Sequence, residues 1–158
     1  MSYSHSFFYK VGDYMADIYF SDINRKKVYR LPILPEDMPE LSISANNEEF
    51  ETFNDGVYNF LNKSGLTTFS VESWLPACAG KYSFAKSKVD PYTLINFWRL
   101  AMTNKTPIRC VMDRSKNKNI SNPEIVNLMV TVEQLTWHED TVGDVYYNLD
   151  VKEYRSVT

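Results

Sequence analysis

The sequence predicts a mainly β domain of the α+β class, in which antiparallel strands are flanked by one α-helix at about residues 90–104. Three observations carry this prediction. Apolar residues alternate at period two along much of the chain, which is typical of half-buried strands. One segment shows helical spacing instead. Aromatic residues make up 15% of the 158 positions, and they favour pleated surfaces and protein interfaces.

The clearest strand pattern lies near the C-terminal end. Four residues share one face of a first segment: Val126, Leu128, Val130 and Val132. Four more share one face of a second segment: Val145, Tyr147, Leu149 and Val151. The polar connection at residues 138–144 contains Gly143, which is free to adopt a positive φ. We therefore expect a long antiparallel hairpin with one face in the core.

Shorter strands are expected earlier in the chain. Residues 16–35 predict two strands around a turn at 22–26, closed by prolines that cannot donate to a central ladder. A third short strand is predicted at 40–46. Residues 56–76 predict a strand, a turn at Gly65 and a second strand, and residues 107–113 predict one more.

One helix is well marked. Asp90 suits the N-cap and Pro91 the first helical position. An apolar stripe follows at helical spacing: Leu94, Phe97, Trp98 and Ala101. The helix should end near Thr103, before Pro107, and its stripe is interpreted as core.

The chain has the length of one domain, and we expect that domain at residues 16–158. Residues 1–15 are aromatic and polar without periodicity, so they are expected to form an arm that orders against a neighbouring chain. Residues 76–88 show neither period and predict a long loop between strand and helix.

The charge balance argues against a protein that grips nucleic acid by neutralising phosphates. The formal net charge is −3. A basic cluster, Arg114, Lys116 and Lys118, alternates with small polar residues and is interpreted as a solvated loop. An OB-like nucleic-acid or ligand-binding module stays an alternative, because "KVYRLP" and "KEYR" interleave basic and aromatic residues.

The residues needed for enzyme chemistry are sparse. Cys78 and Cys110 have no second Cys or His at metal-ligand spacing, and neither His5 nor His138 has a partner nearby. No glycine-rich phosphate loop occurs. The sequence therefore predicts no catalytic site, no cofactor and no metal. It also lacks a secretory signal and an apolar run of roughly 20 residues, so we expect a soluble protein made in the cytoplasm, without a membrane partner.

Four ordered blocks between Asp17 and Arg155 resemble the N-terminal domain of the LysM-bearing baseplate proteins of contractile phage tails and defective prophages, the PBSX-type family. The blocks are "YRLPILPEDMPEL", "NDGVYNFLNKSGLTTFSVESWLP", "PYTLINFWRLAMTNKTPIRCVM" and "NLMVTVEQLTWHEDTVGDVYYNLDVKEYR". The last block resembles a terminal hairpin that closes on "GD-x-x-Y-x-L-x-L-x-EYR". The family continues into a LysM module, whereas this sequence stops at Thr158, so we carry over no peptidoglycan binding.

The resemblance implies a β-barrel or sandwich related to tail-tube proteins. It implies assembly with copies of itself in a ring, six-fold by the family's pattern, near the junction of tail tube and baseplate hub. The implied partners are the tail-tube protein, the hub or spike, and sheath-initiator or wedge proteins, with DNA only as passing cargo. The mature location would be the tail or baseplate of the particle.

Residues for ring contacts are predicted from exposed aromatic and basic segments. Long alternating strands leave sheet edges that neighbours must cover, and interfaces are enriched in aromatic residues. The predicted contact residues come from the N-terminal arm, the long loop and the basic loop: Phe7, Phe8, Tyr9, Tyr82, Phe84, Arg114, Lys116 and Lys118.

Overall fold

The computed structural model describes residues 16–114 and 124–157. The described residues form β1 (Asp17–Ser21), β2 (Val28–Arg30), β3 (Glu48–Thr52), β4 (Gly56–Phe60), β5 (Thr68–Leu75), α2 (Pro91–Thr103), β6 (Ile108–Asp113), β7 (Ile125–Glu139) and β8 (Val145–Glu153). Six strands make one antiparallel sheet in the order β2-β1-β6-β7-β8-β5, and β3 and β4 pair separately.

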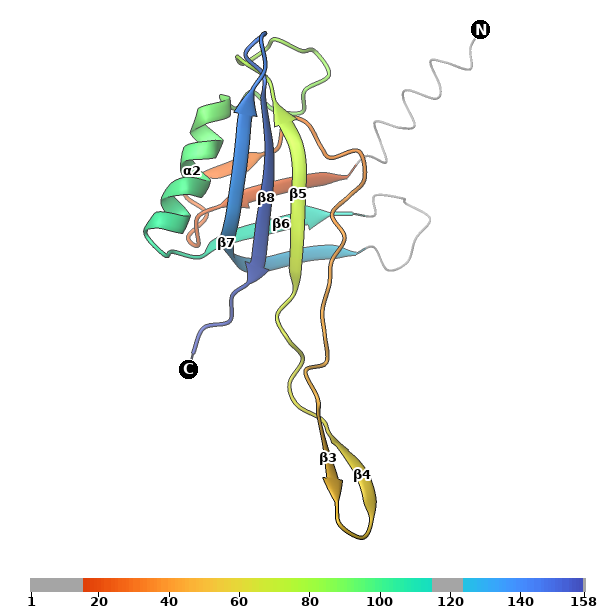
Figure 1. Cartoon of the computed structure of the whole chain (residues 1–158). Helices are drawn as coiled ribbons and strands as arrows, with labels where there is room; N and C mark the ends of the chain where they lie inside the picture. Colours follow the sequence, from red (N-terminus) through yellow and green to blue (C-terminus); the bar gives the residue numbers. More distant parts are fainter. Residues whose placement is uncertain (1–15, 115–123, 158) are drawn as a thin grey trace, which may run out of the picture.

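The long strand β7 belongs to both halves of the six-stranded sheet. Its first half pairs with β6, from Ile125 to Val130, and its second half pairs with β8 as far as Glu139. The register shifts between Val132 and Gln134, and such bulges bend a strand. The sheet therefore folds over, so that β5, β8 and the end of β7 cross β6, β1 and β2 (Figure 1).

The core lies between the two halves, and α2 closes one side of it (Figure 1). Trp98 of α2 is fully buried, and its ring lies 5.3 Å from that of Phe20 on β1 and 4.9 Å from that of Tyr147 on β8. One helical side chain thus contacts both halves of the sheet. The predicted core stripe of this helix is confirmed for Leu94, Trp98 and Ala101, which are buried.

The predicted helix is confirmed at both ends. It begins at Pro91 and ends at Thr103, with Asp90 in the extended N-cap conformation. The Asp90 side chain, however, makes no capping hydrogen bond, and its backbone carbonyl accepts from the Thr93 N–H at 3.2 Å instead.

The predicted fold class is confirmed, together with the C-terminal hairpin, the strands around residues 22–26, the strand at 107–113 and the long loop at 76–88. Gly143 in the C-terminal hairpin connection has φ +91°, as its position in the turn requires. β7 extends seven residues beyond the apolar segment that ends at Val132, up to Glu139.

One strand prediction and one turn prediction are wrong. Residues 40–46 form no strand, and only a bridge from Ser42 to Thr68 pairs them with the sheet. The two predicted strands at 56–76 exist, but they do not pair with each other around Gly65. β4 instead pairs with β3, because a short turn after Thr52 closes a local hairpin. This pairing is not predicted from the sequence. β5 pairs with β8, because its apolar face belongs to the core.

The predicted N-terminal arm, residues 1–15, lies outside the described residues. In the part of the chain that is described, no helix is long and apolar enough to cross a membrane.

Candidate assembly interface

A slender arm extends from the body of the protein. We define it as residues 43–67, comprising two legs and the hairpin β3–β4 at its end. In Figure 1 it points away from the folded sheet at the end where the chain leaves β8. Every residue of β3 and β4 is exposed except the half-buried Thr52. The arm therefore offers nearly all of its surface to other molecules.

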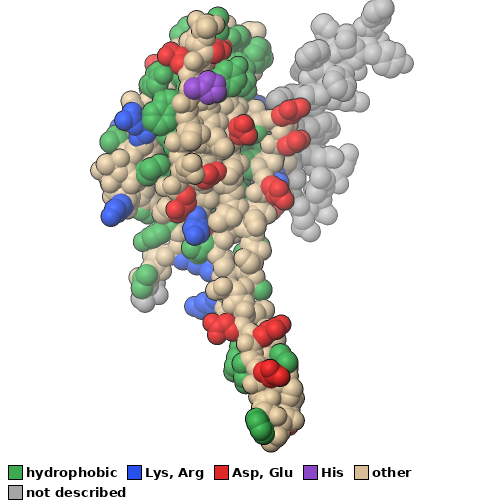
Figure 2. Space-filling model, viewed as in Figure 1, with side chains coloured by type: hydrophobic (Ala, Val, Ile, Leu, Met, Phe, Trp, Pro, Cys, Tyr) green, Lys and Arg blue, Asp and Glu red, His purple; other side chains and the backbone are tan. Residues whose placement is uncertain are grey.

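The hairpin has an aromatic face and an acidic face. The pairing places Phe50 opposite Tyr58, and Phe60 lies on the same face. The ring of Phe50 stacks on Tyr58 at 5.7 Å and on Phe60 at 4.5 Å. Glu49 and Glu51 point to the opposite face because successive side chains of a strand alternate. Figure 2 shows acidic and hydrophobic side chains together along the arm.

The hairpin turn is built from local polar contacts. The Thr52 hydroxyl accepts a hydrogen bond from the Asp55 N–H at 3.1 Å and donates one to the Gly56 carbonyl at 2.9 Å. Gly56 has φ +89°, a conformation that favours glycine. This turn fixes the register that brings the aromatic residues to one face.

The two legs of the arm are held together along their length. The Asn47 side chain accepts from the Asn62 N–H at 2.9 Å, and the Asn62 amide donates to the Asn46 carbonyl at 3.2 Å. Nearer the body, the Gly65 N–H donates to the Ser44 carbonyl at 2.6 Å. A Cβ at Gly65 would lie 3.3 Å from that carbonyl oxygen, so glycine allows the close approach.

The residues that follow β8 clamp the base of the arm. Glu153 accepts a hydrogen bond from the Thr67 N–H at 2.9 Å. Arg155 donates to the carbonyls of Ser64 at 3.0 Å and Gly65 at 3.2 Å, and it pairs with Glu153 at 3.3 Å. The hydrogen bond from the Thr67 N–H and, to a smaller extent, the Arg155 guanidinium stabilise the ionised carboxylate of Glu153. Burial alone would raise the pKa of Glu153, but these two contacts outweigh it, so the pKa is lowered. The terminal "EYR" motif thus fixes one leg of the arm to the sheet.

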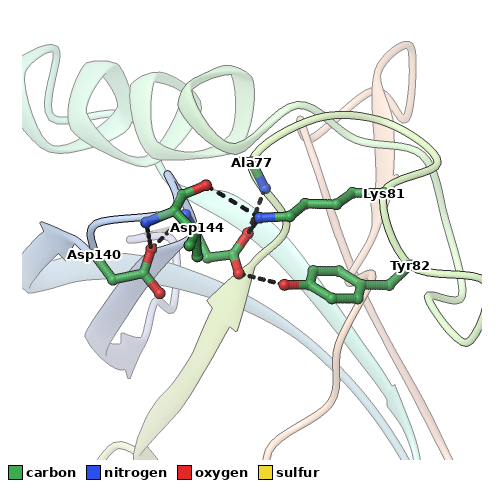
Figure 3. A network of polar contacts seen from close by, with 6 residues as sticks. Ala77, Lys81, Tyr82, Asp140 and Asp144 are labelled. Atoms are coloured by element: carbon green, nitrogen blue, oxygen red, sulfur yellow. Dashed lines mark hydrogen bonds and ion pairs between the residues drawn. The ribbon is translucent and has the colours of Figure 1, made fainter.

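At the other end of the body, Asp144 ties the long loop to the turn between β7 and β8 (Figure 3). Its carboxylate accepts from the Ala77 N–H at 2.8 Å, the Lys81 ammonium at 3.0 Å and the Tyr82 hydroxyl at 2.7 Å. Burial alone would raise the pKa of Asp144, but these donors outweigh it and hold the pKa below its usual range. The Asp144 N–H also donates to Asp140.

Aromatic rings gather beside this network. The Trp74 ring of β5 lies 5.2 Å from that of Tyr82 and 6.3 Å from those of Phe84 and Tyr146. Tyr82 is half-buried and held by Asp144, whereas Phe84 is 64% exposed. Phe84 is therefore an exposed ring in a loop that the contacts of Asp144 hold in place.

The structure brings together only some of the residues predicted from sequence to make contacts. Tyr82 and Phe84 are neighbours, with ring centres 5.2 Å apart. Arg114 is half-buried at the end of β6 and lies 3.5 Å from Glu124. Five predicted residues lie outside the described residues: Phe7, Phe8, Tyr9, Lys116 and Lys118. The contact role of all eight stays a prediction.

The aromatic face of the arm is not among the contact surfaces predicted from the sequence. Its signal is present, because Phe50, Tyr58 and Phe60 sit at even spacing on either side of the turn-forming "NDG". No strand is predicted at residues 47–52, where three of the six residues are glutamate, a residue depleted in strands. Only the pairing of Phe50 with Tyr58 brings these aromatic residues to one surface.

The outward face of β5, β8 and the end of β7 combines polar side chains with an aromatic group, Trp74, Tyr146 and His138, and with Lys152. It carries exposed or half-buried hydroxyl, amide and carboxyl side chains: Ser70, Glu72, Gln134, Thr136, Asn148 and Asp150. Figure 2 views this face, on which acidic side chains are scattered. Tyr29 belongs to "KVYRLP", one of the two segments that suggested an OB-like binding module. Its ring packs inward, 5.2 Å from that of Phe97.

Residues 16–114 and 124–157 contain no cluster of three or more His, Cys, Asp or Glu side chains that could hold a metal ion. Cys110 is buried, and its burial raises the pKa of the thiol, while Cys78 is exposed.

The folded-over six-stranded sheet with one closing helix defines a tail-tube-like fold. The SPP1 tail tube, solved by solid-state NMR and cryo-EM, matches with a TM-score of 0.56 and 11% identity, over 87% of this chain and 72% of that one. The cryo-EM structure of the anti-feeding prophage baseplate, six-fold symmetrised, matches with a TM-score of 0.53 and 9% identity, over 89% of each chain.

These likenesses confirm the predicted phage-tail-related fold. No family model matches the sequence, and no curated protein matches it. The narrower resemblance to the PBSX-type family therefore stays a prediction.

Proposed function

We propose that this chain is a structural, non-enzymatic subunit of a phage tail or phage-tail-like particle. The observation that carries the proposal is the likeness of almost the whole fold to two subunits of such particles, a tail tube and a baseplate. A shared fold can host unrelated functions, so the surfaces of this chain must support the same role. Three of them do.

The sheet edges support assembly into a ring. β5 pairs with β8 along all eight of its residues, whereas among the described residues its other edge is bridged to the chain only from Thr68 to Ser42. An edge strand of this length is a template for pairing with another chain. Copies joined head to tail around an axis would cover these edges, and a closed ring leaves none open. We infer six copies from the family resemblance.

The polar outward face of β5, β8 and β7 supports a channel lining. Most of its side chains are hydroxyl, amide and acidic groups, such as Ser70, Asn148 and Glu72, and Lys152 is a basic residue on the same face. Such a surface repels phosphates instead of binding them, which suits DNA that passes through without being held. In this proposal the face lines the lumen, and α2 lies on the other side of the sheet (Figure 1).

Within the particle, we place the ring at the junction of the tail tube and the baseplate hub, as a tube initiator or an adaptor between tube and spike. This finer position follows from the "EYR" block and its resemblance to the PBSX-type family. The partners would be the tube protein, the hub or spike, and a sheath-initiator or wedge protein. Assembly would take place in the bacterial cytoplasm, before the subunit is incorporated into the tail.

Electron microscopy and mass photometry test the ring. The purified chain, alone and mixed with tube and hub proteins encoded beside it, should form rings with the mass of six copies. Glu72→Pro removes a backbone donor from the edge of β5, because the Glu72 N–H, like that of Thr68, points away from β8, and it should reduce ring formation. Ile43→Ser, an exposed change on the arm, should leave rings intact. Monomers in every mixture would overturn the proposed function.

A further inference from the structure

The hairpin β3–β4 has an uncovered aromatic face. An isolated two-stranded hairpin is marginally stable in water and gains stability when its apolar face packs against another element. Phe50, Tyr58 and Phe60 are 40%, 47% and 57% exposed, although they stack on one another. No other element of the described chain pairs with β3 or β4. The arm is therefore built to pack against a second molecule.

A hollow of matching character lies on the body. It has a volume of about 350 Å³ and is formed where the turn between β1 and β2 meets the C-terminal end of α2. Its apolar lining comes from both elements and includes Ile23, Phe97, Leu100 and Pro107. Ile23 and Leu100 are 40% and 59% exposed, so apolar surface is open to a partner there.

The charges beside the hairpin and beside the hollow are opposite. The hairpin carries four acidic residues and no basic one: Glu48, Glu49, Glu51 and Asp55. Beside the hollow, the β1–β2 turn and the end of α2 expose four basic residues: Arg25, Lys26, Lys27 and Lys105. Asp22, which also lines the hollow, accepts a hydrogen bond from the Lys27 N–H at 3.1 Å. Opposite charges around an apolar contact select a partner and fix its register.

We propose that the aromatic face of the hairpin of one copy seats in the hollow beside α2 of a second copy. The arm cannot reach its own hollow, because Glu153 and Arg155 fix its base and it points away from the body (Figure 1). Such a head-to-tail contact repeats from copy to copy and joins one ring to the next. The inference rests on the proposed function and names the partner of the arm.

Disulfide trapping tests the contact directly. In a Cys78→Ser background, Phe60→Cys on the arm and Leu100→Cys in the hollow should form a disulfide between copies on mild oxidation. The matched control pairs Leu100→Cys with Asn59→Cys, whose side chain lies on the opposite face of β4. The first pair should give cross-linked multimers and the second should not. No cross-link in the first pair, or equal cross-linking in both, overturns the inference whether or not rings form.

Charge reversal separates this inference from the proposed function. Glu48→Lys on the aromatic face with Asp55→Lys in the hairpin turn, or Lys26→Glu with Lys27→Glu beside the hollow, should each reduce stacking of rings at low salt by about tenfold. The quadruple variant should restore stacking. Single rings should form in every variant, because these side chains are exposed and lie off the edges of the six-stranded sheet. Rings that stack equally well in both double variants would overturn the inference and leave the ring proposal intact.

Discussion

The carboxylate of Glu153 accepts a hydrogen bond from the Thr67 N–H at 2.9 Å, although the two residues lie 86 positions apart. The Glu153 N–H also donates to the Thr67 carbonyl at 2.7 Å. This reciprocal pair joins the end of β8 to the point where the arm enters β5. The direction of the arm therefore depends on β8, the last strand in the sequence.

Glu153→Ala should loosen the arm more than the body. The change removes a charge-assisted acceptor and leaves the Thr67 N–H without it, at a cost of about 1–2 kcal/mol. Hydrogen exchange at Thr67 should accelerate, while exchange in α2 should stay unchanged. Glu133→Ala, which removes an exposed carboxylate at the β7 bulge, is the matched control. Equal acceleration in arm and helix would show that Glu153 stabilises the whole domain instead.

Asp144 and Glu153 predict a loss of stability in acid. The pKa of each is lowered in the folded chain, so their stabilising contributions are complete above the ordinary carboxyl range and disappear as pH falls through the folded values. The melting temperature should therefore decline below about pH 5. Asp144→Asn should melt earlier at pH 7 and show a shallower decline.

The control for this acid sensitivity is Glu72→Gln, which alters an exposed side chain on the outer face of β5. It should keep the wild-type profile of melting temperature against pH. A steep decline in Asp144→Asn that matches the wild type would contradict the assigned role of Asp144.

The sequence predicted the elements whose signals are local. The Asp90–Pro91 start of the helix and the alternation around Val130 and Leu149 depend on neighbours in the chain, so these elements were identified. The pairing of β5 with β8 is not predicted from the sequence, because it joins segments about 80 residues apart and depends on which apolar faces meet. Local pattern carries no such information.

The candidate interface was predicted less well for a related reason. The sequence predicts Tyr82 and Phe84 as contact residues from their aromatic character in a loop, and the structure shows that Asp144 holds Tyr82 in place. The arm depends on the pairing of Phe50 with Tyr58 and on the contacts of Arg155 with Ser64 and Gly65. The pairing depends on the register of β3 against β4, and the Arg155 contacts join residues about 90 positions apart. Neither can be predicted from composition.

Trp98 should dominate the stability of the core. Trp98→Ala removes a fully buried ring that contacts both halves of the sheet, and it should cost about 3–5 kcal/mol in the free energy of unfolding. Trp98→Phe should cost less than about 2 kcal/mol, because it keeps a ring and removes a buried indole N–H that has no hydrogen-bond partner among the described residues. Urea denaturation measures both. A phenylalanine variant as unstable as the alanine variant would contradict this account.

Gly143→Ala should open the contact between the β7–β8 turn and the long loop. Gly143 has φ +91°, and an added Cβ would lie 3.1 Å from that of Ala77, whose N–H donates to Asp144. Backbone strain and crowding together should cost about 1–3 kcal/mol and raise the exposure of Tyr82. Gly80→Ala is the matched control, because Gly80 has φ +81° but nothing within 4 Å of the added atom. The difference between the two melting temperatures then measures the crowding against Ala77, and equal losses would assign the whole effect to backbone strain.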